Sequence, residues 1–462
     1  MKIHLLRNRL WFCTIVLVGL SFPLQVYTRS PLPALLPYLL IGMNLELFGR
    51  KRPSLRVDRR YSVNIDVMVI IYVLLVLLNT AWQIAFSVIG FAEAMNALVV
   101  YLPPVIFYAY FSRSASEEEI RSSLRAMIFV GLVVGLYFTY DSYIKLALGQ
   151  VSDYSQAAFE YSVARSGAGA DVNEARIAIG NRSHGLLESH SVSGAWVIIG
   201  ALAALTLLPR NRPALRRASV LLFGTMVLLG LNFTAIIAFA IIMYLLEFSG
   251  ITAARGRNSS VVVNFMALVL IVAIWAGVAL WATGDSMSEF ILEIFLFQTA
   301  LALGTGEVGL SYPDIWRDHL ASYYTHLSDY PPALLLGDGF STYGIPKGSD
   351  IGLVETLATF GLPYFLVLMF CLVKLIGTAL HQVRNPVGGS AAAPEGGLDR
   401  ANVLQFSVGM TLLVLITDLH YTVWPAKSVL PIFFCALALY GRYSAAPRRS
   451  SLDLPPIVQT TG

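Results

Sequence analysis

The sequence predicts an all-α membrane protein, a polytopic bundle of about twelve transmembrane helices with two long loops on its outer face. Only 13% of the 462 residues are charged, whereas a soluble globular chain carries about 25%. The apolar residues gather in twelve runs, each close to the roughly 20 residues that cross the hydrocarbon core as a helix. None of these runs alternates as the strands of a membrane barrel do, so helices are expected.

The predicted spans lie near residues 10–28, 31–48, 63–81, 93–112, 125–147, 191–209, 218–232, 233–249, 260–282, 351–377, 402–419 and 424–441. The apolar stretch 218–249 is longer than one span requires. We therefore expect it to form two short helices that meet near Asn232.

Lysine and arginine residues predict the orientation, because cytoplasmic loops of membrane proteins are enriched in them. With the N terminus inside, the basic segments 50–60, 112–125, 209–217 and 253–258 all fall on the inner side. Only eight of the 32 Lys and Arg residues are then external: Arg29, Lys145, Arg165, Arg176, Arg182, Arg317, Lys347 and Lys427. The sequence thus predicts a multi-pass protein of a bacterial inner membrane with both termini in the cytoplasm.

The bundle is expected to form one domain, residues 1–445, followed by a disordered cytoplasmic tail, residues 446–462. Two outer loops are long, at about 148–190 and about 283–350. Long loops in a compact fold are usually functional or disordered, and these two contain tyrosine, arginine and histidine residues. We therefore expect them to carry the functional site. The three cysteines lie singly in apolar runs, which predicts free thiols and no metal site.

The first long loop ends in a dense group of ionisable residues. Arg182, His184, Glu188 and His190 fall within nine residues at the start of a predicted helix. Spacings of three and four residues lie on one face once the helix begins, so these side chains can meet a substrate at the membrane surface. The alternative is that they mark the interface and cap the helix.

The second long loop carries aromatic and charged residues at helical spacing. Trp316, Arg317 and His319 lie among Asp314, Asp318 and several tyrosines, which predicts an amphipathic helix along the outer membrane surface. A guanidinium suits a diphosphate, because its fork donates two parallel hydrogen bonds. The alternative is an interfacial arginine paired with Asp314 or Asp318.

Two carboxylates follow at the outer mouth of the tenth predicted helix, Asp350 and Glu355. Carboxylates close to a membrane core are costly and usually functional, although Asp350 also suits a helix N-cap. Asp418 and His420 end the eleventh helix and are candidates for the same site. The sequence has no nucleotide-binding loop, no DxD, HExxH or GxSxG motif and no basic aromatic surface, so no cofactor, metal or nucleic acid is expected.

Three stretches resemble the superfamily of O-antigen polymerases and O-antigen ligases. These are NRSHGLLESHSVSG at 181–194, WRDHLASYYTHLSDYPPALLLGDGF at 316–340 and SDIGLVETLATFGLPYFLVL at 349–368. The similarity of layout covers roughly residues 60–440. Each motif is short, and their order, spacing and predicted side of the membrane agree with the family.

The resemblance implies a metal-independent glycosyltransferase without a cofactor that uses an undecaprenyl-diphosphate-linked glycan at the periplasmic face. It implies membrane lipid and a chain-length regulator protein as partners. Under it, Arg182 and Arg317 bind diphosphate, and Asp350, Glu188 or His190 orients or deprotonates the acceptor hydroxyl. The expected remaining substrate contacts are His184, His319, Trp316 and Glu355.

The chain departs from the family in two places. Ligases carry a histidine where this chain has Asp350, which favours a polymerase of O-antigen, capsule or exopolysaccharide repeats over a ligase. The turn NFTA at 232–235 lacks the arginine that the family has there. A rival class is a lipid-linked oligosaccharide flippase, but transporters need polar or broken helices at the bilayer midplane, and charge here concentrates in the outer loops.

Overall fold

The computed structural model of the chain describes residues 2–48, 59–86, 90–148, 152–166, 185–230, 232–248, 312–329, 331–337, 352–384, 398–419, 423–424 and 426–444. Within these ranges all regular structure is helical, as the sequence predicts. The helices are α1 (Lys2–Thr28), η1 (Leu32–Leu35), α2 (Leu36–Phe48), α3 (Arg59–Ala85), α4 (Phe91–Tyr101), α5 (Val105–Arg113), α6 (Glu117–Leu148), α7 (Asp153–Ser166), α9 (His190–Leu207), α10 (Pro213–Leu229), α11 (Phe233–Met243), η2 (Tyr244–Phe248), α14 (Tyr312–Asp329), α15 (Ala333–Leu336), α16 (Gly352–Arg384), α17 (Arg400–Thr417) and α18 (Leu430–Ser444).

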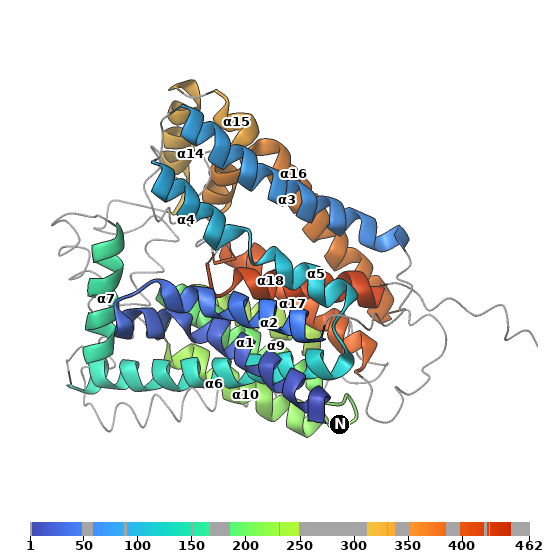
Figure 1. Cartoon of the computed structure of the whole chain (residues 1–462). Helices are drawn as coiled ribbons and strands as arrows, with labels where there is room; N and C mark the ends of the chain where they lie inside the picture. Colours follow the sequence, from blue (N-terminus) through green and yellow to red (C-terminus); the bar gives the residue numbers. More distant parts are fainter. Residues whose placement is uncertain are drawn as a thin grey trace, which may run out of the picture.

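The helices pack around α9, which is the buried centre of the bundle. It contacts α6, α10, α11 and α17, and every residue from Ser191 to Thr206 is buried. Figure 1 shows α1, α6, α9 and α10 in the lower half, α3, α15 and α16 in the upper half, and α5, α17 and α18 between them. A helix that is apolar all round must be covered by its neighbours, which explains the position of α9.

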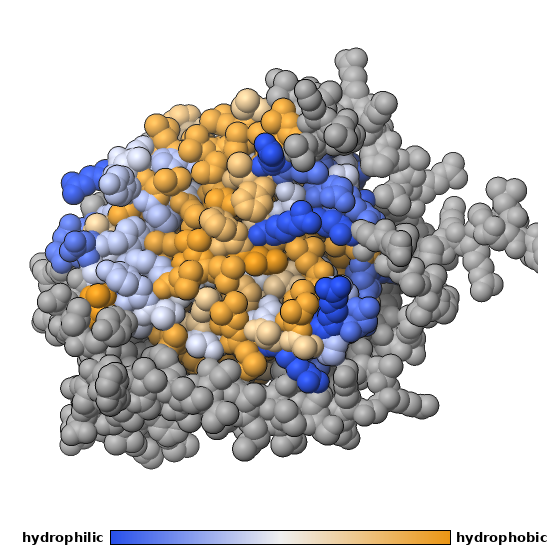
Figure 2. Space-filling view, turned by 90° about the horizontal axis from the view of Figure 1, so that it is seen from below, coloured by the Kyte–Doolittle hydropathy of each residue, from blue (hydrophilic) through white to orange (hydrophobic). Residues whose placement is uncertain are grey.

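Six of the described helices are long and apolar enough to cross a membrane, and three shorter apolar helices accompany them. Lipid-facing side chains such as Leu74 on α3 and Phe370 on α16 are exposed. On the face drawn in Figure 2, hydrophobic side chains fill a broad central band, and hydrophilic ones lie toward its two ends. The protein is therefore a multi-pass α-helical membrane protein. The number of twelve spans stays a prediction, because the run 260–282 lies outside the described residues.

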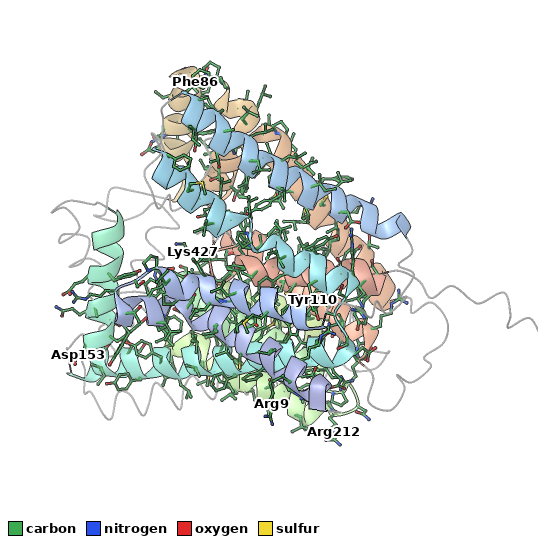
Figure 3. The ribbon with its side chains drawn as sticks, viewed as in Figure 1. Arg9, Phe86, Tyr110, Asp153, Arg212 and Lys427 are labelled. Carbon is green, nitrogen blue, oxygen red and sulfur yellow. The ribbon has the colours of Figure 1, made fainter. Side chains whose placement is uncertain are left out.

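One end of the bundle is held by arginines, and we call it the basic end. Arg216 forms a buried ion pair with Glu247, and Arg7 pairs with Glu119 at the start of α6. Arg442, near the end of α18, donates to the carbonyl of Ala115 just before α6. The N-terminal part of α1 and the C-terminal part of α18 thus lie at the same end of the bundle. Figure 3 shows Arg9, Tyr110 and Arg212 toward this end, and Asp153 and Lys427 toward the opposite one.

The apolar stretch 218–249 divides as predicted. α10 ends at Leu229 and α11 begins at Phe233, with Asn232 as the N-cap whose Oδ1 accepts from the backbone N–H of Ala235 at 3.1 Å. A polar cap at this point satisfies one of the first free N–H groups of the new helix. The division near Asn232 is confirmed.

One predicted single span is divided into two helices, and this expectation needs correction. The span predicted at 93–112 consists of α4 and α5, separated at Pro103 and Pro104, because proline has no N–H and its ring obstructs the preceding turn. The span predicted at 351–377 is present as the candidate membrane span Gly352–Thr378, which is kinked at Gly361, where φ is 75° and ψ is 167°. The predicted tail 446–462 lies beyond the described residues.

Candidate functional site

Three carboxylates gather at the end of the bundle opposite the basic end, and we call them the carboxylate cluster: Glu188, Glu355 and Asp418. The charge of Glu355 acts on Asp418. The charges of Glu355 and Glu188 both act on the hydroxyl of Tyr101, at the end of α4. The cluster therefore joins the turn before α9, the start of α16 and the end of α17, with Glu355 linking Tyr101 to Asp418.

Glu188 has one carboxylate oxygen bonded and one without a partner. Its Oε2 accepts from the hydroxyl of Ser428 at 3.1 Å, while its Oε1 is shielded from solvent and has no hydrogen-bond donor in the described structure. Burial raises the pKa of Glu188, and hydrogen bonding from its own backbone and from Ser428, together with the charge of Lys427, opposes this rise. A buried acceptor without a donor costs free energy, so Oε1 is a natural contact for a ligand hydroxyl.

The backbone on either side of Glu188 is fixed by hydrogen bonds. Tyr154 on α7 donates its hydroxyl to the carbonyl of Leu186 at 2.7 Å. The N–H of Leu187 donates to Ser193 Oγ at 3.1 Å. Ser189 is the N-cap of α9, because its hydroxyl oxygen accepts from the backbone N–H of Val192 at 3.2 Å. Glu188 is thus carried by a rigid turn directly before the central helix.

The helix α7 is itself anchored through a buried carboxylate. Asp141 on α6 accepts from the hydroxyls of Ser152 and Ser155, at 2.6 and 2.9 Å. The hydroxyl of Tyr137 lies 2.8 Å from Ser152 Oγ. Since Ser152 and Ser155 stand at the start of α7, this network holds the helix on α6 and, through Tyr154, supports the turn that carries Glu188.

Asp418 is oriented by two side chains from other elements. The indole of Trp424 donates to Thr356 Oγ1 at 3.2 Å, and the hydroxyl of Thr356 donates to Asp418 Oδ2 at 3.2 Å. The remaining oxygen, Oδ1, is buried without a donor in the described structure. Burial is the main cause that raises the pKa of Asp418 well above its usual value, and the charge of Glu355 adds to it. Burial therefore shifts the equilibrium of Asp418 toward the protonated form relative to an exposed aspartate.

The outer part of α16 is held by a close backbone crossing. Gly337 follows α15 and Gly361 interrupts α16, and a Cβ on either glycine would lie under 3 Å from the backbone of the other segment. On a neighbouring helix, Asn79 Nδ2 donates to the carbonyl of Thr359 at 3.2 Å. Two of the stretches that carry the family resemblance are thus in direct contact, and together with α3 they position Glu355.

The residues predicted as a site have different outcomes. Glu188 and Glu355 belong to the carboxylate cluster, and His190 begins α9 two residues after Glu188, half-exposed. Arg317 lies on α14, where a helix was predicted, but its side chain is 73% exposed and its Nε lies 3.7 Å from Asp318 Oδ1. Trp316 and His319 belong to the same helix, and their side chains lie outside the described part, as do Arg182, His184, Asp350 and His420.

Several contributors to the site were not singled out from the sequence. Lys427 and Ser428 precede α18, Tyr101 ends α4, and Thr356 and Trp424 orient Asp418. The available signal was Lys427, one of the eight basic residues predicted outside. Among the described residues, no three His, Cys, Asp or Glu side chains are arranged to hold a metal ion.

The fold and this cluster define the class of the protein: a multi-pass α-helical membrane protein with three carboxylates gathered at one end of its bundle. Compared with known proteins, the chain matches no family model and, at a significant level, no curated sequence.

Proposed function

We propose that the protein is a membrane glycosyltransferase that polymerises undecaprenyl-diphosphate-linked oligosaccharide repeats at the periplasmic face of the inner membrane. The resemblance of residues 181–194, 316–340 and 349–368 to O-antigen polymerases supports this class of reaction. The carboxylate cluster supports it independently, because it lies opposite the basic end, which the distribution of Lys and Arg assigns to the cytoplasm. In the proposed reaction the lipid-linked oligosaccharides are polymerised on the periplasmic side of the membrane, whereas nucleotide sugars are on the cytoplasmic side.

The single observation that carries the proposal is Oε1 of Glu188, which has no hydrogen-bond donor among the described residues. An acceptor-only oxygen in a buried position needs a donor from elsewhere. A sugar hydroxyl is such a donor, and a carboxylate that binds a hydroxyl is also placed to remove its proton. The bond from Ser428 and the charge of Lys427 both favour the ionised form that this role requires.

In the proposed reaction, the acceptor hydroxyl attacks the anomeric carbon of the donor sugar while the bond from that carbon to the diphosphate oxygen breaks. The electron pair of this bond leaves with the diphosphate, and Glu188 takes the proton of the acceptor hydroxyl. His190 and Asp350 are the alternative bases. Arg182 and Arg317 hold the diphosphate through charge-assisted hydrogen bonds. Activity is expected to persist after removal of divalent cations with a chelator.

The test is elongation of a purified lipid-linked repeat by the purified protein in detergent, without an ion gradient. Glu188→Gln keeps the bond from Ser428 but cannot take a proton, so the rate of elongation should fall by about 10²–10⁴-fold. The matched control is Glu160→Gln on α7, whose carboxylate is exposed and accepts from Gln156. This control should elongate as the unmodified protein does.

The products of the reaction distinguish a polymerase from a ligase. A ladder of lengthened products supports a polymerase, whereas a single transfer to a different lipid or protein acceptor would identify an O-antigen ligase instead. Wild-type elongation that is matched by Glu188→Gln, at equal protein levels on a blot, would exclude Glu188 as the base. A wild-type protein that elongates nothing contradicts the proposed function.

A second candidate is favoured by one observation. Broken helices in a bundle are a feature of transporters, and the described structure breaks at Pro103–Pro104 and at Gly361. A lipid-linked oligosaccharide flippase would use such breaks for passage. It would move fluorescent lipid-linked glycan between the leaflets of liposomes without lengthening it, and this result would replace the polymerase proposal.

A further inference from the structure

Asp418, at the end of α17, is bound to the first turn of α16 at two points. Its backbone carbonyl accepts from the N–H of Leu353 at 2.8 Å, and its Oδ2 accepts from the hydroxyl of Thr356 at 3.2 Å. Glu355 lies between these two residues in the sequence, directly before Thr356. The end of α17 therefore holds the short stretch of α16 that carries Glu355.

The direction of the bond from Thr356 is fixed by Trp424. The indole N–H of Trp424 can only donate, so Thr356 Oγ1 accepts this bond, at 3.2 Å. The one hydroxyl proton of Thr356 is then directed to Asp418 Oδ2. Trp424 is buried and stacks on Phe360 of α16, with the ring centroids 5.3 Å apart. Three side chains from different elements thus form one ordered chain of hydrogen bonds.

The surroundings of Asp418 suit a neutral carboxylic acid. The residue is 0% exposed, and among the described residues its Oδ1 has no donor and no basic side chain pairs with it. A buried carboxylate without a cation or a full set of donors is costly in free energy. The charge of Glu355 also opposes the ionisation of Asp418. A proton on Asp418 removes both the buried charge and its repulsion by Glu355.

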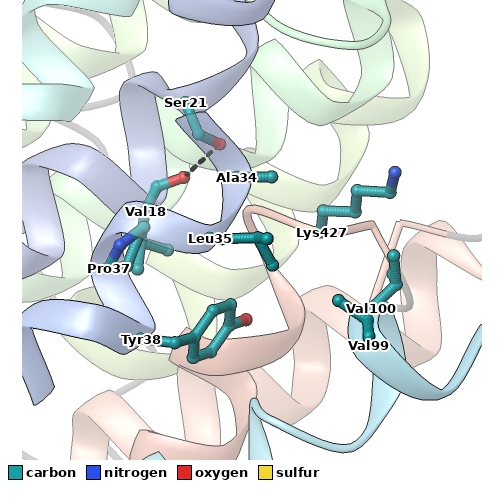
Figure 4. Close-up of a pocket in the computed structure, with 9 residues that line it drawn as sticks. All are labelled: Val18, Ser21, Ala34, Leu35, Pro37, Tyr38, Val99, Val100 and Lys427. Atoms are coloured by element: carbon teal, nitrogen blue, oxygen red, sulfur yellow. Dashed lines mark hydrogen bonds between the residues drawn. The ribbon is translucent and has the colours of Figure 1, made fainter. Parts of the chain in front are cut away.

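The basic residue of this region acts on a different carboxylate. The charge of Lys427 acts on Glu188, and Figure 4 shows Lys427 beside Val99 of α4, at the edge of a small pocket. The groups that act on Asp418 belong to α16 and to the turn before α18, and they are Glu355, Thr356 and Trp424. Only the first of these three carries a charge, and that charge is negative.

We propose that Asp418 is a positioning residue for Glu355 and acts as a neutral acid, so that its ionisation displaces the Glu355 carboxylate and weakens the binding of substrate. Two negative charges would then repel each other across the contact between α16 and α17. The role of Glu355 as a substrate contact rests on the proposed function. The proton on Asp418 depends only on the buried contact with α16, so it can be measured without any turnover.

Infrared difference spectroscopy of the purified protein in detergent measures the proton. The spectrum of the unmodified protein minus that of Asp418→Asn should contain the carbonyl band of a protonated carboxylic acid at neutral pH. This band should shift in heavy water and disappear at alkaline pH. Thr356→Val removes a donor that favours the ionised form, so the band should persist to higher pH. Glu355→Gln removes a repelling charge, so the band should disappear at lower pH.

Elongation kinetics test the positioning. The KM of the unmodified protein for the lipid-linked repeat should rise at alkaline pH, and Asp418→Asn should lose this rise, because asparagine keeps the bond from Thr356 without titrating. Asp418→Leu removes the acceptor and should raise KM by about tenfold at every pH, as expected for the loss of one hydrogen bond. The matched control is Thr417→Val, whose buried hydroxyl bonds to Leu413 within α17. It should change neither the band nor KM.

Two results overturn the inference: the absence of a carboxylic-acid band that Asp418→Asn removes, or an alkaline rise of KM that Asp418→Asn retains. Thermal unfolding reports whether each variant folds, and the isosteric Asp418→Asn supplies the test if Asp418→Leu does not. Elongation by the unmodified protein without the band would refute only this inference. A protein that elongates nothing but shows the band would refute the proposed function and leave the proton on Asp418 established.

Discussion

Gly337 and Gly361 meet backbone to backbone where α15 crosses α16. A Cβ on Gly337 would lie 2.6 Å from the amide nitrogen of Gly361, and a Cβ on Gly361 would lie 2.9 Å from the amide nitrogen of Gly337. Both glycines also have positive φ values, 72° and 75°. Only glycine combines this backbone conformation with such a close approach. The crossing holds the first turns of α16, which carry Glu355 and Thr356.

The crossing predicts an unequal response to alanine within one helix. Gly361→Ala should lower the free energy of unfolding by at least about 1–3 kcal/mol, because the strained φ and the contact with Leu335 both oppose a Cβ. Gly377→Ala, further along α16, has no atom within 4 Å of its added Cβ and should cost nothing. Thermal unfolding in detergent compares the two variants. Equal unfolding temperatures would show that the glycine crossing does not form.

The raised pKa of Asp418 predicts a stability that depends on pH. Its folded-state pKa lies above the unfolded value of about 3.9, so the folded protein binds this proton more tightly. The contribution of Asp418 to the free energy of unfolding therefore falls as pH rises from about 4 through the folded-state pKa. Asparagine does not titrate, and its side-chain oxygen can still accept the hydrogen bond from Thr356. The free energy of unfolding of Asp418→Asn should therefore increase relative to that of the unmodified protein as pH rises.

Thermal unfolding between about pH 5 and pH 9 tests this change, with the exposed Glu160→Gln as control. The difference between Asp418→Asn and the unmodified protein should widen with pH, while the control stays parallel. A constant difference across the series means that Asp418 is ionised throughout.

Arg317 tests the proposed contact with diphosphate against the ion pair with Asp318. If Arg317 binds diphosphate, Arg317→Ala should lose most elongation activity and Arg317→Lys should keep part of it, because lysine retains the charge without the fork. Asp318→Asn removes the ion-pair partner and should leave activity nearly unchanged. If Arg317→Ala elongates normally at a normal protein level, Arg317 does not bind the diphosphate.

The orientation can be measured with reporter fusions. Fusions after Arg165 and Tyr330 should report the periplasm, and fusions after Arg255 and Ser390 should report the cytoplasm, because the basic segments are predicted inside. A cytoplasmic signal after Tyr330 would contradict the topology and, with it, the outer position of the carboxylate cluster.

The helices were predictable from the sequence, because the length of an apolar run is a local property. The division at Asn232 followed from length and a good cap, and the break at Pro103–Pro104 has a plain local signal that the apolar pattern obscured. Glu188 stood out as part of a dense group of ionisable residues, and Glu355 stood out because a carboxylate close to a membrane core is costly in free energy. Their partners did not: Ser428 meets Glu188 across 240 residues of sequence, and no local pattern indicates a contact between such distant elements.

The two attachments of α18 have a consequence for communication across the membrane. At one end Arg442 holds the carbonyl of Ala115, and at the other the turn that leads into α18 carries Lys427 and Ser428. Its helical residues are almost all buried, which makes the helix a stiff rod between the two faces. A displacement of α18 along its axis would therefore alter the Arg442–Ala115 contact and the Ser428–Glu188 hydrogen bond together.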